Sequence, residues 1–402
     1  MRIKSQASTR TAAVVAAAIA VFPLAGWTAG THPSDHAAAR QPHGQVRFDV
    51  LNAVAASSAT DAWAVGYKSI GRNPSFTLIE HWNGTRWTRV ASPSPGEGAV
   101  LSGVVAFSRH NAWAVGSGSS DKVLIEHWTG SRWLVAPTGA SPGTLNSISA
   151  ISPSDMWAAG CGDPACASTT LIEHWNGRNW KRVPSPNPGG TGVRHSSVLL
   201  GISAISRSNV WAVGYFNKTG LHGFAPRTLV EHWNGTSWKQ VSSPNPGGPQ
   251  EMNTLNGVVA TSAKAAMAVG DVRNVRNSSV TDHPLAMRWN GVRWRRVFTP
   301  NQPQAIETLN SVSATSSSNA WAVGDFSNSP ATEPLIQHWN GTAWKTVPVP
   351  HISGELDAFL SGVTVLNAKA AWAVGHAMFE DQTTLIMRWN GTKWKVAPSP
   401  NP

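Results

Sequence analysis

The sequence predicts an all-β chain that folds as a seven-bladed β-propeller of four-stranded antiparallel blades. Three observations support this prediction. One pattern recurs seven times along the 402 residues, four short strand-like runs lie in every copy, and an Asn-Gly turn joins the last two runs in six copies. A four-stranded unit that is apolar on both faces cannot bury them alone, so seven such units are expected to pack around a ring.

Leucine and tryptophan spacing defines the copies. Each copy begins at a leucine, and twelve residues later comes a tryptophan, or Met267 in the fifth copy, followed by Ala-Val-Gly or Ala-Ala-Gly. Two more tryptophans follow, five residues apart, and only Trp27 lies outside the pattern. We therefore expect the repeated tryptophans to form the core between blades rather than platforms for sugars. The copies start at Leu51, Leu101, Leu145, Leu199, Leu255, Leu309 and Leu360.

Four strands, named a to d in chain order, are predicted in each copy. In the third copy they are the runs 145–152, 157–160, 171–175 and 180–183, which are rich in branched and aromatic residues and are separated by turn residues. The spacing between strands a and b and between c and d is constant. The b–c and d–a spacings vary, from 15 to 22 and from 12 to 19 residues. In an up-and-down blade both variable connections lie at the same end, so this face is the predicted binding face.

The Trp-Ala-Val-Gly run and the Trp-Asn-Gly-Thr-x-Trp hairpin after it resemble kelch-type and Asp-box propeller repeats. These groups include the central domain of galactose oxidase and the sialidases. The resemblance covers Leu51 to Pro402 and implies a fold, not an activity. Trp82 and its equivalents stand where an Asp-box carries its acid. The arginine triad with a tyrosine nucleophile and the copper-ligand pattern of those enzymes are missing from the sequence.

The first 30 residues have the features of an export signal, with Arg2, Lys4 and Arg10 ahead of an apolar stretch at 11–26. An uncleaved membrane anchor is the alternative. Residues 31–44 are expected to be a flexible segment and 45–402 the propeller. The predicted location is secreted or attached to the cell envelope. There Cys161 and Cys166 would form a disulfide, with two free thiols as the alternative.

Acidic residues gather in the variable loops of the last two copies. Between Phe298 and Thr384 these loops hold seven acids and no Lys or Arg. Carboxylates at this density can hold calcium or accept hydrogen bonds from sugar hydroxyls, although they can also simply keep loops soluble. Calcium is the one cofactor considered, and no other metal is assigned. The predicted ligand-binding residues are Glu333, Glu355, Asp357, Glu380 and Asp381.

The sequence favours a non-catalytic extracellular propeller that binds a cell-envelope polysaccharide or a protein partner on the variable face. The recurring Glu-His pair, as in Glu80 and His81, is expected to be structural because it occurs in four copies. No catalytic residue is therefore assigned. A glycoside hydrolase or lyase using loop acids and a structural protein that adheres to the envelope are the alternatives. We expect a monomer that binds no nucleic acid and, once the signal is cleaved, no membrane.

Overall fold

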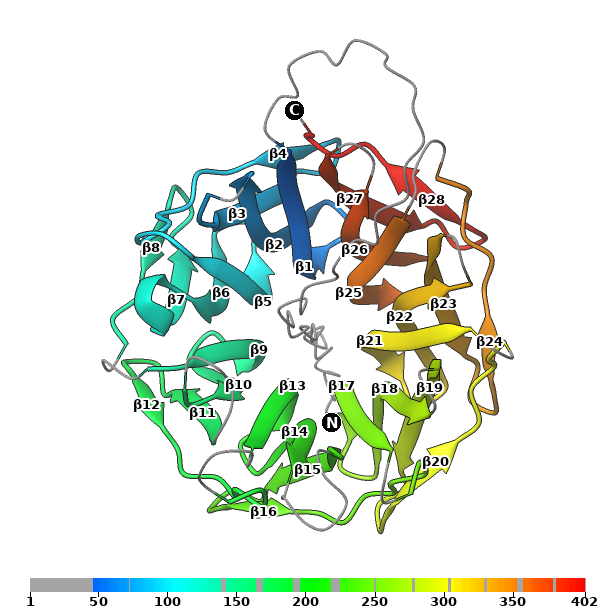
Figure 1. The fold of residues 1–402 in the computed structure, drawn as a ribbon. Helices are drawn as coiled ribbons and strands as arrows, with labels where there is room; N and C mark the ends of the chain where they lie inside the picture. Colours follow the sequence, from blue (N-terminus) through cyan, green and yellow to red (C-terminus); the bar gives the residue numbers. More distant parts are fainter. Residues whose placement is uncertain are drawn as a thin grey trace, which may run out of the picture.

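The computed structural model describes residues 46–401 apart from 72, 139–141, 164–168, 191–195, 218–224, 249–250, 277–278, 303–304, 329–330, 353–356 and 379–380. The predicted export signal and the segment 31–44 lie outside the described residues. Seven four-stranded antiparallel blades form a ring, which confirms the predicted fold (Figure 1). Among the helical residues described, none belongs to a helix long and apolar enough to cross a membrane.

Every blade consists of four consecutive strands, and blade numbers follow the chain. Blade 1 holds β1 (Arg47–Ser58), β2 (Asp61–Ile70), β3 (Phe76–Trp82) and β4 (Trp87–Arg89). Blade 2 holds β5 (Val100–Ser108), β6 (Asn111–Ser117), β7 (Val123–Trp128) and β8 (Trp133–Val135), with a short 3-10 turn, η1 (Ser119–Asp121), after β6. Blade 3 holds β9 (Thr144–Ser152), β10 (Asp155–Cys161), β11 (Thr170–Trp175) and β12 (Trp180–Arg182). Blade 4 holds β13 (Ser196–Ser206), β14 (Asn209–Asn217), β15 (Arg227–Trp233) and β16 (Trp238–Gln240).

The last three blades follow the same order. Blade 5 holds β17 (Met252–Ser262), β18 (Ala265–Arg276), β19 (Ser279–Trp289) and β20 (Trp294–Val297). Blade 6 holds β21 (Ile306–Ser316), β22 (Asn319–Ser327), β23 (Thr332–Trp339) and β24 (Trp344–Thr346). Blade 7 holds β25 (Asp357–Asn367), β26 (Ala370–Met378), β27 (Gln382–Trp389) and β28 (Trp394–Ala397). In all seven, strand a lies nearest the centre of the ring and strand d lies at its circumference (Figure 1).

The glycine of strand b is required by a close approach between strands a and b. At Gly66, an added Cβ would lie 1.9 Å from the carbonyl oxygen of Val50. The equivalent glycines of the other six blades meet the same backbone carbonyl at 1.9 or 2.0 Å. A side chain at this position would force the two strands apart, which explains why every copy carries glycine there.

The tryptophans pack between blades, as the sequence predicted. Trp63 of blade 1 contacts Trp128 and Trp133 of blade 2, with ring centroids 5.0 and 5.2 Å apart. The same arrangement recurs at five of the other six junctions, while Met267 takes the strand b position between blades 5 and 6. The hydrophobic core of the molecule is therefore a series of clusters between neighbouring blades.

The first and last blades close the ring, and we call the junction between them the seam. Its apolar core includes Leu51 and Trp87 from blade 1 and Trp372 from blade 7. At its edge, Phe48 pairs with Gln382 in a single parallel bridge. The sequence also allows residues 45–50 to add a separate strand at the seam, but in the structure residues 47–50 lengthen β1, and residue 45 lies outside the described residues. Each blade is thus complete in itself, and the seam is held by this packing together with a few hydrogen bonds between blades 1 and 7.

Candidate functional site

The ring has two different ends. We call the end that carries the b–c and d–a connections the loop face, and the end that carries the a–b turns and c–d hairpins the turn face. All length variation between blades lies on the loop face, while the turn face repeats with constant spacing. The sequence analysis placed the binding site on the loop face.

Three of the five predicted loop-face acids lie among the described residues. Glu333 and Asp357 line one cavity of about 260 Å³ together with His351. The carboxylate of Asp357 accepts a hydrogen bond from the backbone N–H of Thr332, at 2.7 Å, which ties blade 7 to blade 6. Asp381 accepts one from the backbone N–H of Arg47, at 2.8 Å, and so lies at the seam.

The structure therefore brings Glu333 and Asp357 together and places Asp381 at a different junction. Glu355 and Glu380 lie outside the described residues. Among the residues described, no three His, Cys, Asp or Glu side chains form a group that could hold a metal ion. Calcium or sugar binding by the five acids stays a prediction. So does the disulfide, since Cys161 is buried at the end of β10 and Cys166 lies outside the described residues.

The Glu-His pairs of strand c are structural. His81 stacks on Trp63, with centroids 4.1 Å apart, and its Nε2 lies 2.7 Å from Oδ1 of Asp61. The same His position contacts Asp155 in blade 3 and Asn111, Asn209 and Asn319 in blades 2, 4 and 6. Ser57 also bonds Asp61 rather than the histidine, so no serine nucleophile is activated there.

The glutamates next to these histidines are buried between blades. Burial raises the pKa of Glu80 and Glu126 to about 7 and that of Glu231 to about 8. Glu126 accepts a hydrogen bond from Ser92 in the preceding blade's d–a connection, at 2.9 Å, and Ser399 reaches Glu80 in the same way across the seam. Glu80 and Glu126 thus link neighbouring blades through hydrogen bonds, which is a structural role.

A second acidic cluster lies at the loop-face ends of β18, β19 and β22, and it joins Asp325, one of the seven predicted loop acids, to two acids of blade 5 that the sequence analysis did not single out. Burial and the nearby charge of Asp282 raise the pKa of Asp271 to about 7, and burial also raises the pKa of Asp325. Arg273 binds both carboxylate oxygens of the fully buried Asp282, at 2.9 and 2.7 Å. Asp271 and Asp325 both follow the strand b glycine. In all five other blades that position holds Tyr, Ser, Cys or His, which is the signal the sequence offered.

The turn face is strongly basic. Its a–b turns and c–d hairpins contain two acids, Asp61 and Asp155, and both are buried and bonded to histidines. Their basic residues are Arg86, Arg109, Arg132, Arg178, Arg207, Lys264, Arg293, Lys369 and Lys393. Most of the molecule's positive charge, formally +11, is therefore located at this end and on the neighbouring strands d.

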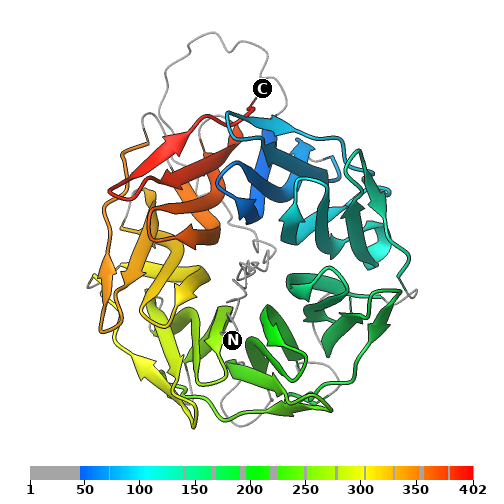
Figure 2. The same ribbon diagram turned by 180° about the vertical axis from the view of Figure 1, so that it is seen from behind.

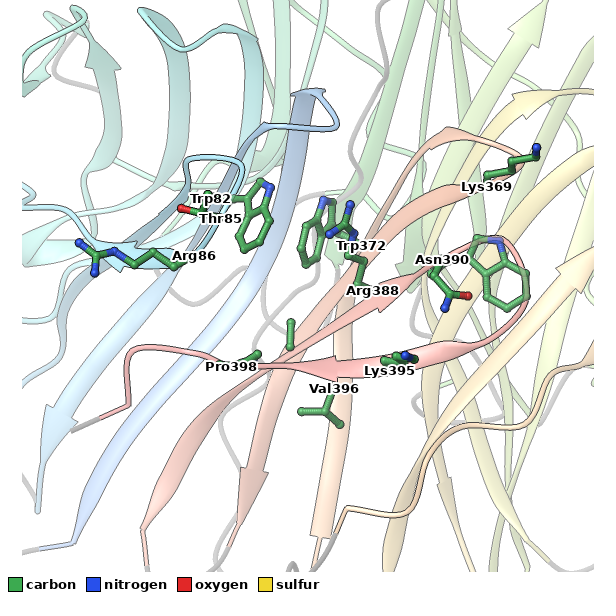
Figure 3. A pocket seen from close by; sticks show the side chains of 12 residues that line it. Trp82, Thr85, Arg86, Lys369, Trp372, Arg388, Asn390, Lys395, Val396 and Pro398 are labelled. Atoms are coloured by element: carbon green, nitrogen blue, oxygen red, sulfur yellow. The ribbon is translucent and has the colours of Figure 1, made fainter.

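A groove lies at the turn-face end of the seam, and we call it the seam groove (Figure 3). Its volume is about 490 Å³, and none of the described residues that line it is acidic. Its apolar lining comes from three tryptophans and from the chain around Val396, which is 46 % exposed. The four cations in its lining are exposed and have no ion-pair partner among the described residues: Arg86, Lys369, Arg388 and Lys395.

Arg388 is the central cation of the groove. Its guanidinium lies 5.2 Å from the ring centre of Trp372 and 5.6 Å from that of Trp82, so it rests on aromatic faces from both blades (Figure 3). The hairpins on either side are rigid, because the Asn83 side chain accepts the backbone N–H of Arg86, at 3.1 Å, and Asn390 does the same for Lys393, at 2.9 Å. The hairpin backbones beside the groove are therefore fixed, and Arg388 is held over a partly apolar floor.

Neither a protein-family model nor a curated protein sequence matches this chain. Solved structures do. An ulvan lyase of polysaccharide lyase family PL25, bound to -[GlcA(1-4)Rha3S]-, is 10 % identical over 85 % of this chain and 92 % of its own, with a TM-score of 0.60. YCF48 bound to D1 peptide is 12 % identical over 87 % and 94 %, with a TM-score of 0.46. The fucose-specific lectin of Aleuria aurantia is 11 % identical over 78 % and 100 %, with a TM-score of 0.40.

All three are β-propellers. At these identities the likeness concerns the fold alone.

Proposed function

We propose that this chain is an exported, non-catalytic binding propeller for an anionic polysaccharide, which it holds on the turn face with the seam groove as the main contact. The observation that carries the proposal is a groove lined by four cations and three tryptophans. Among the described residues, these cations have no ion-pair partner and no acid joins the lining. An anionic ligand would reduce the electrostatic repulsion between these neighbouring cations, so its binding would be favourable.

The composition of the groove favours a saccharide over an inorganic anion. Arg86 and Arg388 can each bind a carboxylate, sulfate or phosphate through two N–H groups. Trp389, which is half-buried, and the exposed side of Val396 offer apolar surface for the C–H face of a sugar ring. An acidic polymer supplies both kinds of group in one chain. The predicted export signal would bring the ring to the cell envelope, where such polymers are found.

Binding to polygalacturonate, compared with neutral dextran, tests the proposal. The protein without its predicted signal is expected to bind the uronate polymer with an affinity that falls as salt rises. Replacing Arg86, Arg388 and Lys395 by Gln removes three contacts of about 0.5 kcal/mol or more each. Affinity is then expected to fall about tenfold or more. Calorimetric titration measures both effects.

The matched control removes three exposed cations elsewhere. A variant with Lys181, Arg182 and Lys239 replaced by Gln loses the same charge from blades 3 and 4. It is expected to bind nearly as tightly as the unchanged protein. Equal losses in the two variants would mean that net charge, not the groove, sets the affinity, and equal binding of dextran would exclude an anionic ligand.

A polysaccharide-cleaving enzyme is the second candidate, and the cluster at Asp271 favours it. A carboxyl group with a pKa of about 7, near Asp325 and Arg273, has the protonation behaviour of a general acid. The same incubations with polygalacturonate decide this point, because cleavage shortens the polymer and lowers its viscosity. We expect unchanged viscosity. A fall that disappears in an Asp271→Asn variant would identify an enzyme.

A further inference from the structure

Blades 5 and 7 differ from the other five blades in the same three ways. Strand b begins with alanine, Ala265 or Ala370, where the others carry Asp or Asn. The residue before that alanine is lysine, and strand c carries Met-Arg in place of Glu-His or Gln-His. The changes are physically linked, because the Asp or Asn of the other blades is the hydrogen-bond partner of their strand c histidine. When the strand b Asp or Asn and the strand c histidine are both replaced, an arginine can occupy the histidine position.

The linked changes give blade 5 the same cationic turn-face end as blade 7. Arg288 lies 5.9 Å from the ring centre of Trp339 in blade 6, as Arg388 lies over Trp82 across the seam. Both tryptophans are buried, at 3 % and 8 % exposure. At junctions whose preceding blade carries histidine, the equivalent tryptophan is only half-buried. The arginine is thus a repeated structural element, present twice in the ring.

Further cations surround Arg288. Lys264 comes from the a–b turn, Arg293 from the c–d hairpin and Arg295 from strand d, and all three are exposed. No ion pair within the described part of the chain neutralises any of them. Lys369, Lys393 and Lys395 occupy the same positions in blade 7. We call the blade 5 set, Lys264, Arg288, Arg293 and Arg295, the blade 5 cluster.

The two sites are not identical. Met267 stands in place of Trp372, and Ala343 stands where the seam has Arg86. The cavity beside Arg288 is only about 10 Å³. The blade 5 cluster therefore offers charge at the surface, while the seam offers charge together with an apolar recess. Such a site is suited to the anionic groups of a ligand rather than to the enclosure of a sugar ring.

We infer that the blade 5 cluster is a second binding site for the anionic polysaccharide, so that one polymer chain contacts the ring at two places on either side of blade 6. Blades 5 and 7 flank blade 6 along the ring (Figure 2). The inference rests on the proposed function. Its consequence is avidity, because a polymer held at the seam is presented to blade 5 at high effective concentration, whereas a short fragment cannot use both sites.

The test compares two ligands and two variants. The ligands are polygalacturonate and its tetramer. The blade 5 variant carries Lys264→Ser, Arg293→Ser and Arg295→Gln, which leaves Arg288 on Trp339 and so preserves the packing. The seam variant carries the three Gln replacements described above. The triple variant of blades 3 and 4 is again the charge-matched control, and thermal unfolding checks that every variant folds.

The expected results separate the two sites. The unchanged protein binds the polymer at least about tenfold more tightly than the tetramer. The blade 5 variant loses that advantage but keeps the tetramer affinity of the seam, and calorimetry shows one tetramer fewer per ring. If the blade 5 variant binds polymer as tightly as the control variant does, the second site is refuted and the proposed function stands. If neither ligand binds the unchanged protein, the proposed function itself fails.

Discussion

The two ends of this ring differ in what varies between blades. On the loop face the connections differ in length, and the carboxylates described there mostly hold the protein together: Asp357 and Asp381 each accept a backbone N–H from a neighbouring blade. On the turn face the spacing never changes, but the side chains do. Arg388 replaces histidine there, and Lys369 replaces a small residue or histidine.

The face on which connection lengths vary therefore need not be the face on which the side-chain chemistry of the blades varies. A turn of fixed geometry can change its side chains without disturbing the scaffold, and in blades 5 and 7 it has exchanged a paired histidine for unpaired cations. Loop length was the basis for placing the binding site on the loop face. The loop-face site stays a prediction, the seam groove is the basis of our proposal for the turn face, and the following measurements compare the two ends.

The largest effect is expected from Trp372, whose side chain is 2 % exposed and packs on Trp82 and Trp87 across the seam. Trp372→Ala should lower the free energy of unfolding by about 3–5 kcal/mol, because it leaves a cavity in the core that closes the ring. It should also weaken polygalacturonate binding, since Arg388 loses one of its two aromatic supports.

Denaturant unfolding measures the change in stability, with Met267→Ala between blades 5 and 6 as the matched variant. Both substitutions remove a large strand b side chain from a junction, but only Trp372 lies at the seam. A loss in Trp372→Ala below about 1 kcal/mol would contradict the view that aromatic packing is the main contact that closes the ring.

The fold was predictable because its determinants are local and repeated. Gly66 and its six equivalents are required by one carbonyl contact, and each strand c tryptophan donates its Nε1 hydrogen to the a–b turn of its own blade, as Trp82 does to Ala59 at 3.2 Å. Such contacts occur within one copy, and their sequence signature therefore recurs with every copy.

The seam groove was not predictable in the same way. Arg86 and Arg388 are about three hundred residues apart, and they meet only because the ring closes. The Met-Arg pairs of blades 5 and 7 were visible as departures from the repeat. Their meaning depends on the loss of the Asp or Asn partner in strand b, and this becomes clear only once the histidine contacts are known.

A second, smaller effect concerns pH and the loop-face end of the junctions. Glu126 is buried, and its pKa is raised by burial to about 7 from an ordinary value of 4.5. Its contribution to stability is fully present below about pH 4.5 and is lost as the pH rises through 7, because the unfolded chain gives up the proton first. The full effect is on the order of 2–3 kcal/mol.

Glu126→Gln removes this dependence, and blade 6 already accommodates glutamine at the same position, where Gln337 donates to Pro300 at 2.9 Å. Relative to the unchanged protein, the variant should gain stability as the pH rises from about 4.5 to about 7, and the difference should then level off. Burial lowers the pKa of His127 and His232, which acts in the opposite sense, so the informative quantity is the difference between the two proteins. A difference that does not change with pH would show that Glu126 is ionised in the folded state.

The smallest effect is expected from the loop-face acids themselves. Asp357→Asn and Asp381→Asn keep an oxygen that can accept the N–H of Thr332 or Arg47, so each should cost less than about 1 kcal/mol in unfolding free energy. Removing the oxygen with Asp357→Ala should cost more, up to about 2 kcal/mol, because a half-buried backbone donor loses its partner.

The same amide changes, combined at Glu333, Glu355, Asp357, Glu380 and Asp381, distinguish the two faces as binding sites. If the turn face holds the ligand, the fivefold variant should bind polygalacturonate as tightly as the unchanged protein, or somewhat more tightly, because five negative charges that repel the polymer have been removed. Calcium titration of both proteins gives the opposing test. If the five amides abolish both calcium binding and polymer binding, the binding site is on the loop face. Carboxylates there would then bind an anionic sugar through the metal ion.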